Sequence, residues 1–100
     1  MKAYRFLEEA DQEFQEHIGY FISHSLTAAE NFVDAGAVRD IREYPQVGAP
    51  ISPIVRQRVL TGFRYSILYV DTPDEIIIVA VAPHRRRPGY WRRRLHHLQQ

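Results

Sequence analysis

The spacing of apolar residues changes once along this chain, and that change does most to limit the folds that are open to it. Between residues 7 and 44, apolar side chains recur every three or four positions, as they do on one face of an α-helix. From residue 55 to residue 82, β-branched and aromatic residues follow in short runs of strand character. The pattern therefore predicts helices followed by strands.

Two helices are expected in the first half of the chain. The first runs from Leu7 to about Ser25 and has acidic residues at its start, where the positive end of the helix dipole favours them. The stretch Thr27-Ala28-Ala29-Glu30 has the form of a capping box, so a second helix should begin near Thr27. Pro45 should end that helix at Tyr44. Because only one or two residues separate them, the helices should form an antiparallel hairpin.

Four strands are expected. Residues 2–6 carry Tyr and Phe at alternate positions and are too short for a helix, so they should form a short strand. After a proline-rich loop at 45–53, strands at 55–60, 64–70 and 75–82 should form an antiparallel meander. The last strand is apolar on both faces and belongs inside the sheet. The expected fold is α+β, with the helical hairpin packed on a mainly antiparallel four-stranded sheet and a short helix or basic tail at the C-terminus.

The composition is typical of one globular domain, which we take to be residues 1–100: 45% of the residues are hydrophobic and 25% are charged. The absence of cysteine excludes disulfides and thiolate metal sites, and we expect neither a metal nor another cofactor. The longest apolar run, from Ile76 to Pro83, is too short to span a bilayer, and the first residues do not resemble a signal peptide. A cytoplasmic protein without membrane contact is expected.

Charge is divided unevenly between the two halves of the chain. Residues 1–50 contain four Lys or Arg and nine Asp or Glu, a net charge of −5, whereas residues 51–100 contain nine and three, a net charge of +6. This division favours a basic surface that binds an acidic partner or a phosphate backbone, the alternative being an arginine cluster on a solvated tail. On the helices, an acidic face opposite the core should keep the protein in solution; it includes Glu9, Glu13, Glu16 and Asp34.

The most distinctive stretch is AVAPHRRRPGYWRRR at residues 80–94. Pro88 suits the first turn of a short final helix, which would hold Tyr90, Trp91 and Arg94 over the end of the sheet. Trp91 is the only tryptophan, and we expect it to anchor this segment by packing more than by contact with a partner. The guanidinium groups of the arginines around it should stay exposed or stack on the Tyr90 and Trp91 rings, and the exposed ones should bind a partner macromolecule.

These segments resemble the RelE/ParE superfamily of type II toxin–antitoxin toxins, and more closely its ParE-like branch, the plasmid stabilisation proteins. The resemblance covers nearly the whole chain and rests on YPQVGAP, VRQRVL, GFRYSILYV and, most specifically, EIIIVAVAPHRRRPGYWRRR. It implies a small toxin that is neutralised by an antitoxin whose C-terminal segment wraps around it. ParE-like members look like inhibitors that trap DNA gyrase on cleaved DNA, whereas RelE-like members cut messenger RNA in the ribosomal A site.

Gyrase inhibition is favoured over RNA cleavage by the residue that follows Tyr65. Similarity to RelE-like nucleases would place an arginine there, but this chain has Ser66, and a hydroxyl group cannot stabilise developing phosphate charge as a guanidinium does. In the nuclease alternative, a histidine after the last strand could act as general base. The candidate catalytic residues of that alternative are Arg56, Arg58, His84, Arg85 and Tyr90.

We therefore expect a toxin that binds its partners and does not itself break bonds. Its partners would be DNA gyrase and a ParD-like antitoxin with an acidic C-terminal segment, the latter in a toxin–antitoxin hetero-oligomer. The ribosome with messenger RNA is the alternative target, and a general nucleic-acid-binding module or an inactive toxin are further alternatives. Ile51 and Ile54 either border the antitoxin groove or belong to the core. The expected target- or antitoxin-binding residues are Arg56, Arg58, Arg85, Arg86, Arg87, Tyr90, Trp91 and Arg94.

Overall fold

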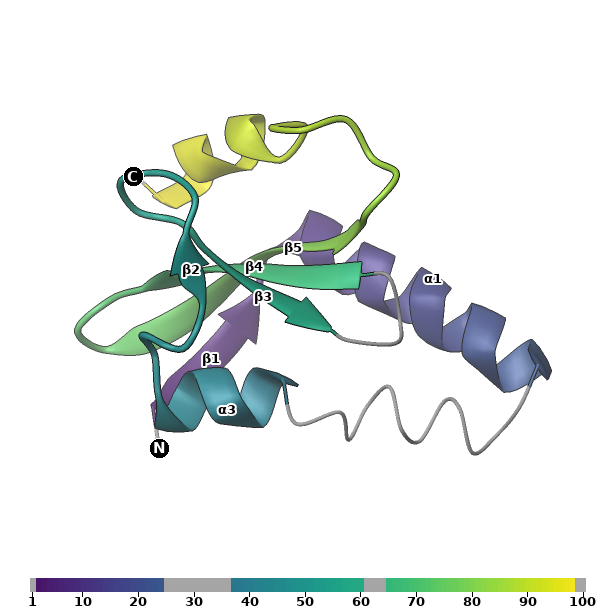
Figure 1. Cartoon of the computed structure of the whole chain (residues 1–100), viewed down its shortest axis with the longest axis horizontal. Coiled ribbons are helices and arrows are strands. Elements are labelled where there is room, and N and C mark those ends of the chain that lie inside the picture. Colours follow the sequence, from purple (N-terminus) through teal and green to yellow (C-terminus); the bar gives the residue numbers. More distant parts are fainter. Residues whose placement is uncertain (1, 25–36, 61–64, 99–100) are drawn as a thin grey trace.

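The computed structural model describes residues 2–24, 37–60 and 65–98, which form an α+β fold around one five-stranded sheet. The strands are β1 (Ala3–Phe6), β2 (Ala49–Pro50), β3 (Arg56–Leu60), β4 (Tyr65–Asp71) and β5 (Glu75–Pro83), in the order β1-β5-β4-β3-β2. β1 pairs with β5 in parallel, and the other neighbours are antiparallel. The predicted fold class, a mainly antiparallel sheet with helices, is confirmed (Figure 1).

The sheet has one strand more than the four that the sequence predicts. The additional strand, β2, lies in the segment predicted to be a proline-rich loop, where Ala49 pairs with Gln57 and Pro50 with Arg56. A strand of two residues is too short to show an alternating pattern, so periodicity could not reveal it. Pro50 has no amide proton to donate, and an edge strand such as β2 is where a sheet accepts proline.

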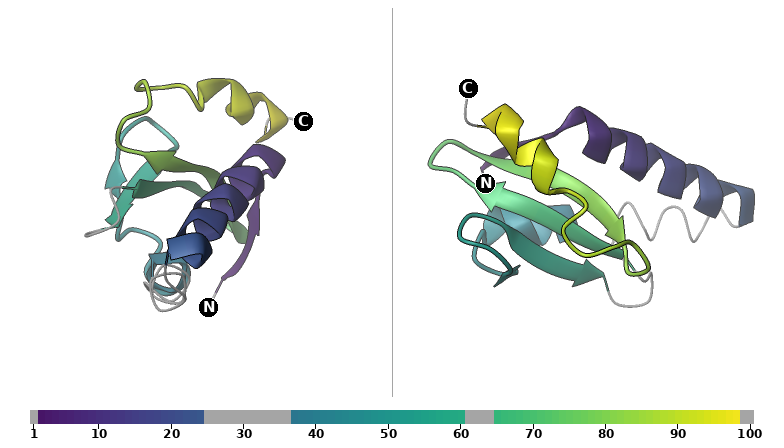
Figure 2. Two further views of the ribbon diagram at one scale, coloured as in Figure 1. Left: turned by 90° about the vertical axis from the view of Figure 1, so that its right-hand side faces the viewer. Right: turned by 90° about the horizontal axis from the view of Figure 1, so that it is seen from above.

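The predicted helices are confirmed where the structure describes them. Helix α1 (Glu8–His24) packs against β5, and Figure 2 shows that it extends past the end of the sheet. Helix α3 (Ala37–Glu43) contacts β3 and ends directly before Tyr44 and Pro45, as the proline predicts. The predicted start of this helix at Thr27, and the hairpin turn before it, lie outside the described residues.

The C-terminal segment crosses the sheet on the side away from α3 and ends in a 3₁₀-helix, η1 (Arg92–Leu98) (Figure 1). The prediction that Pro88 lies in the first turn of the final helix is wrong, since Pro88 and Gly89 precede the helix. Gly89 has a φ of +79°, a left-handed conformation that a right-handed helix cannot include. Trp91 is only 4% exposed and packs on the core, which confirms that it anchors the segment.

Strands β4 and β5 supply most of the core, and Tyr69 at its centre also fixes the loop that carries β2. The Tyr69 hydroxyl donates to the Pro45 carbonyl at 2.6 Å and accepts from the Gly48 amide at 2.9 Å. A Cβ atom at Gly48 would lie 2.7 Å from that hydroxyl oxygen, so only glycine fits there. The loop therefore holds a defined position at the edge of the sheet.

Candidate functional site

A groove of about 530 Å³ lies between one face of the sheet and the segment that follows β5. The pairs Gln57–Leu68 and Val59–Ser66 of β3 and β4 form its floor. The residues that alternate with these along β3 and β4 point to the other face of the sheet and contact the helices: Arg58 binds Asp40 of α3, and Tyr65 packs on His17 of α1. The groove therefore occupies the sheet face that the helices leave uncovered. None of the described residues that line it is acidic, and its basic residues are His84, Arg86, Arg87 and Arg92.

Apolar side chains border the groove as well. Val59 is 49% exposed and Ile51 is 37% exposed, and both line it. Ile54 is 49% exposed but does not line the groove. These exposures exclude the alternative that Ile51 and Ile54 belong to the core. The groove thus combines a floor of mixed apolar and uncharged polar side chains with a basic wall.

Ser66 and His84 form a polar contact within the groove. The Ser66 Oγ lies 3.1 Å from His84 Nε2, and Gln57 Nε2 donates to the same Oγ at 3.1 Å. Ser66 is only 1% exposed, so its hydroxyl is not accessible to act as a nucleophile, whereas His84 is exposed. In the described part of the chain, no carboxylate hydrogen-bonds to His84 and orients its ring, as a catalytic triad requires. The contact joins the end of β5 to the floor of the groove.

Arg56 and Arg58 lie on the opposite face of the sheet from the groove, because residues alternate between faces along β3 and Gln57 faces the groove. Arg56 Nη1 donates to the Gly48 carbonyl at 2.7 Å, and Arg58 Nη2 lies 3.3 Å from Asp40 Oδ2. The structure therefore separates these two arginines from the other candidate catalytic residues, which lie at the groove or at its rim: His84, Arg85 and Tyr90.

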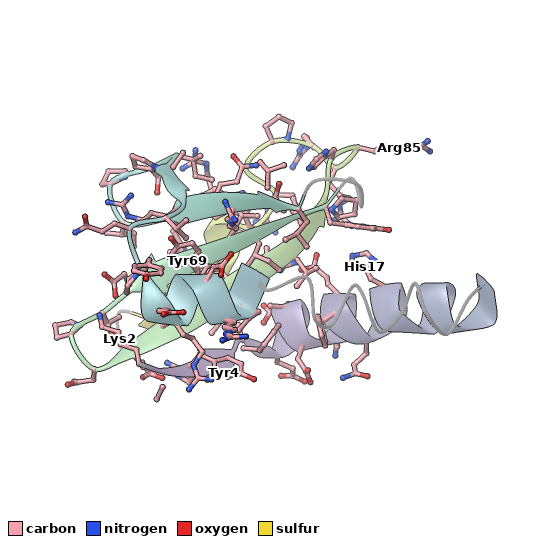
Figure 3. The ribbon with its side chains drawn as sticks, turned by 60° about the horizontal axis from the view of Figure 1, so that its bottom comes forward. Lys2, Tyr4, His17, Tyr69 and Arg85 are labelled. Carbon is pink, nitrogen blue, oxygen red and sulfur yellow. The ribbon has the colours of Figure 1, made fainter. Side chains whose placement is uncertain are left out.

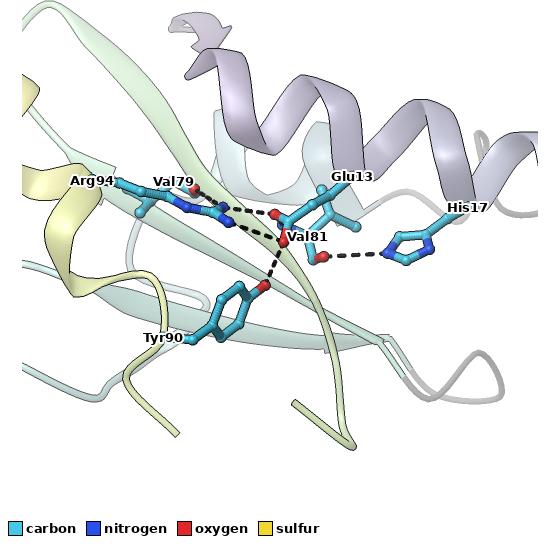
Figure 4. Close-up of polar contacts among 6 residues, drawn as sticks. All are labelled: Glu13, His17, Val79, Val81, Tyr90 and Arg94. Atoms are coloured by element: carbon cyan, nitrogen blue, oxygen red, sulfur yellow. Dashed lines mark hydrogen bonds and ion pairs between the residues drawn. The ribbon is translucent and has the colours of Figure 1, made fainter. Parts of the chain in front are cut away.

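Glu13 of α1 joins the helix to the C-terminal segment and to β5 (Figure 4). Tyr90 Oη donates to Glu13 Oε2 at 2.7 Å, and the Arg94 guanidinium contacts both carboxylate oxygens at 2.7 and 3.1 Å. The Val81 amide donates to Oε1 at 3.1 Å, and Arg94 also donates to the Val79 carbonyl at 3.0 Å. The prediction that Glu13 belongs to a solvated acidic face is wrong, because its side chain is only 13% exposed.

This network shifts the protonation equilibria of its members. Burial alone would raise the pKa of Glu13, but hydrogen bonds from Arg94, Tyr90 and the Val81 amide outweigh burial and lower it. Burial and the hydrogen bond to Glu13 raise the pKa of Tyr90. For Arg94, burial would lower the pKa, but the contact with Glu13 raises it. At neutral pH the network is therefore a carboxylate held by a guanidinium and a neutral phenol.

Five arginines of the C-terminal segment are exposed: Arg85, Arg86, Arg87, Arg92 and Arg93. The Arg86 guanidinium lies 4.1 Å from the centre of the Tyr90 ring, and that of Arg92 lies 5.0 Å from the centre of the Trp91 ring. Figure 3 shows Arg85 directed away from the body of the protein. Arg94 does not belong to this exposed set, because its side chain is 12% exposed and pairs with Glu13. Its guanidinium lies 5.1 Å from the centre of the Tyr90 ring, which agrees with the predicted alternative that an arginine stacks on that ring.

Sequence reasoning missed Glu13 and Gln57 as parts of the site. Glu13 lies three residues after buried Ala10, and that helical spacing was the available signal that it borders the packed face of α1. No sequence signal pointed to Gln57. Within the described ranges, no group of three or more His, Asp or Glu side chains could hold a metal ion, and no helix is long and apolar enough to cross a membrane.

Two comparisons with known proteins relate to this fold and to the family of the chain. Among solved structures, the chain is similar to a chain of the chromosomal ParDE TA system from P. aeruginosa, with a TM-score of 0.66 and 18% sequence identity, covering 83% of this chain and 96% of that one. That likeness concerns the fold. The family model for the ParE toxin of the type II toxin–antitoxin system parDE matches residues 4–88, so the chain belongs to the ParE toxin family. No curated protein matches the sequence.

Proposed function

We propose that this ParE-family toxin acts in the cytoplasm by binding DNA gyrase and trapping it on cleaved DNA, without breaking bonds itself. The observation that carries the proposal is the group of five exposed arginines at residues 85–87 and 92–93, three of which line a groove without acidic residues among its described lining. Guanidinium groups at a rim favour binding to an acidic protein surface or to phosphates. The separation of Arg56 and Arg58 from Tyr90 argues against a nuclease centre.

The antitoxin in this proposal is a ParD-like protein whose acidic C-terminal segment enters the groove. Carboxylates of that segment would pair with Arg86 and Arg87, while its apolar side chains would cover Val59 and Ile51. Toxin and antitoxin would form a hetero-oligomer. Because the same arginines would contact gyrase, an occupied groove would prevent inhibition of the enzyme.

The alternative is ribosome-dependent cleavage of messenger RNA. One observation favours it: His84 is exposed at the groove beside the arginines of residues 85–87, where a bound phosphate would lie near an imidazole. Its hydrogen-bond partner Ser66 is neutral, however, so the floor of the groove has no cation for a pentacovalent phosphate.

The test uses purified gyrase, supercoiled plasmid and ATP, and measures linear DNA released by detergent and protease. We expect the wild-type protein to produce cleaved DNA, and the double variant Arg85→Gln/Arg87→Gln to require about 30-fold more protein, since each of the two exposed contacts adds on the order of 1 kcal/mol. Arg39→Gln removes an exposed arginine of α3 and should behave as the wild type. Codon-specific messenger cleavage in a translation reaction, without gyrase-dependent DNA cleavage, would establish the alternative.

A further inference from the structure

Glu13 forms several hydrogen bonds within the protein, which a carboxylate that only faces solvent would not need. Its two carboxylate oxygens accept hydrogen bonds from the Val81 amide, the Tyr90 hydroxyl and two nitrogens of Arg94. These donors come from β5, from the turn before η1 and from η1 itself. A single side chain of α1 therefore holds both the last strand and the segment that follows it (Figure 4).

The position of Glu13 is set by the edge of β5. β1 pairs with β5 only as far as Phe6 and Ile78, with a final hydrogen bond from the Leu7 amide to the Ile78 carbonyl. Beyond that point β5 has no neighbouring strand on this side among residues 2–24, 37–60 and 65–98, and its register against β4 shifts at Val79. Glu13 and Arg94 supply the missing partners, at the Val81 amide and the Val79 carbonyl. Buried backbone groups need such partners, so this edge requires both side chains.

Tyr90 connects this edge to the groove. Its hydroxyl binds Glu13, while its ring lines the groove and lies under Arg86, whose guanidinium carbon is 4.1 Å from the ring centre. Arg94 lies 5.1 Å from the centre of the same ring. A contact chain therefore runs from Glu13 through Tyr90 to Arg86, a cation of the groove wall. Glu13 is thus connected to the wall through Tyr90, although it does not itself line the groove.

We propose that Glu13 is a positioning residue, which acts through Tyr90 and Arg94 to hold the arginine-bearing segment 84–94 against the sheet and so to fix the basic wall of the groove. Without the carboxylate, a phenol hydroxyl, a guanidinium and a backbone amide lose their acceptor in a site where the pair is at most 13% exposed. Leaving such groups unpaired is costly, so the segment should open to reach water. Trp91 would then lose part of its packing.

Hydrogen exchange of the isolated protein tests the proposal without any partner. In Glu13→Gln, we expect exchange of the Val81 amide and of the protected amides in 84–98 to accelerate about tenfold or more, while β3 and β4 keep their rates. Acrylamide should also quench Trp91 more strongly. Glu16→Gln, an exposed residue of the same helix, is the matched control and should match the wild type. Glu13→Asp keeps the charge and should restore part of the protection.

Two results would overturn the proposal. One is a folded Glu13→Gln variant whose exchange in 84–98 equals that of the wild type, and the other is equal acceleration throughout the sheet, which would mean that Glu13 only adds global stability. If Glu13→Gln fails to fold, Tyr90→Phe removes one bond of the network and keeps the ring; unchanged exchange at 84–98 would then count against the proposal.

A further test of the Glu13 variants uses the gyrase assay, and this test alone rests on the proposed function. In the gyrase assay, Glu13→Gln should need about tenfold more protein than the wild type, and Glu13→Asp should recover part of that loss. If the exchange results are as expected but even the wild type fails to act on gyrase, the proposed function fails and the positioning role stands. If the wild type acts on gyrase and Glu13→Gln is equally potent, Glu13 does not position the segment for that target.

Discussion

Tyr69→Phe should lower the free energy of unfolding by about 2–3 kcal/mol, although it removes a single oxygen atom. The hydroxyl accepts from the Gly48 amide and donates to the Pro45 carbonyl, and Tyr69 has no exposed surface. Gly48 is buried, so its amide loses its partner without gaining water, which costs about 1–3 kcal/mol. Pro45 is partly exposed, and its carbonyl can bind water instead, which adds less than about 1 kcal/mol.

The assay is urea unfolding followed by circular dichroism, with the slope of the transition compared between variants. For a domain of this size, the loss corresponds to a fall in melting temperature of roughly 10–20 °C. Tyr44→Phe removes the hydroxyl of a side chain that is 64% exposed and should change stability by less than about 0.5 kcal/mol. If Tyr69→Phe is as stable as Tyr44→Phe, the hydroxyl does not hold the β2 loop and the reasoning is refuted.

Three further predictions concern the C-terminal segment and its support. Gly89→Ala should cost about 1–2 kcal/mol in urea unfolding, because φ is +79° and the new Cβ would lie 2.9 Å from Arg92 Nε; wild-type stability would contradict this. Trp91→Ala removes a side chain that is 4% exposed, so brief trypsin treatment should cut within 84–94 while the rest of the chain stays intact; equal resistance would disprove the anchor. In the folded protein the pKa of Glu13 lies below its ordinary value of 4.5. The contribution of the Glu13 carboxylate to the free energy of unfolding is therefore complete above pH 4.5, and it is lost as the pH falls through the pKa of the folded state. The groups around it are Tyr90 and Arg94, which keep their protons in this range, and Glu9 and His17 of α1. The difference in urea midpoint between wild type and Glu13→Gln should therefore shrink below about pH 4.5. A difference that persists unchanged to about pH 2.5 would show that the ionised carboxylate of Glu13 is not what stabilises the protein.

The larger elements could be predicted because their signals are local. Pro45 ends a helix through its own ring, and the apolar run of β5 indicates an internal strand without reference to any partner. Trp91 was predicted as an anchor from its size and its uniqueness in the chain. These inferences need only a few neighbouring residues, and the structure confirms them.

The features of the fold and site that could not be predicted depend on contacts between residues far apart in the sequence, or on elements of very few residues. Arg94 and Glu13 are 81 residues apart in the sequence, so nothing local distinguishes this arginine from Arg92 and Arg93, which stay exposed. β2 has two residues and shows no period. Pro88 would favour a helix start, but the positive φ of Gly89 delays it to Arg92.

The parallel pairing of β1 with β5 has a consequence for the order of assembly. Residues 3–6 are synthesised well before their partners, residues 75–78, and Glu13 is synthesised well before its partner Arg94. Contacts between residues that are far apart in the sequence form late and slow folding. A ribosome-bound fragment that stops short of residue 94 lacks both the cover of the β5 edge and the finished wall of the groove. Binding of a partner at that wall therefore requires that synthesis has passed residue 94.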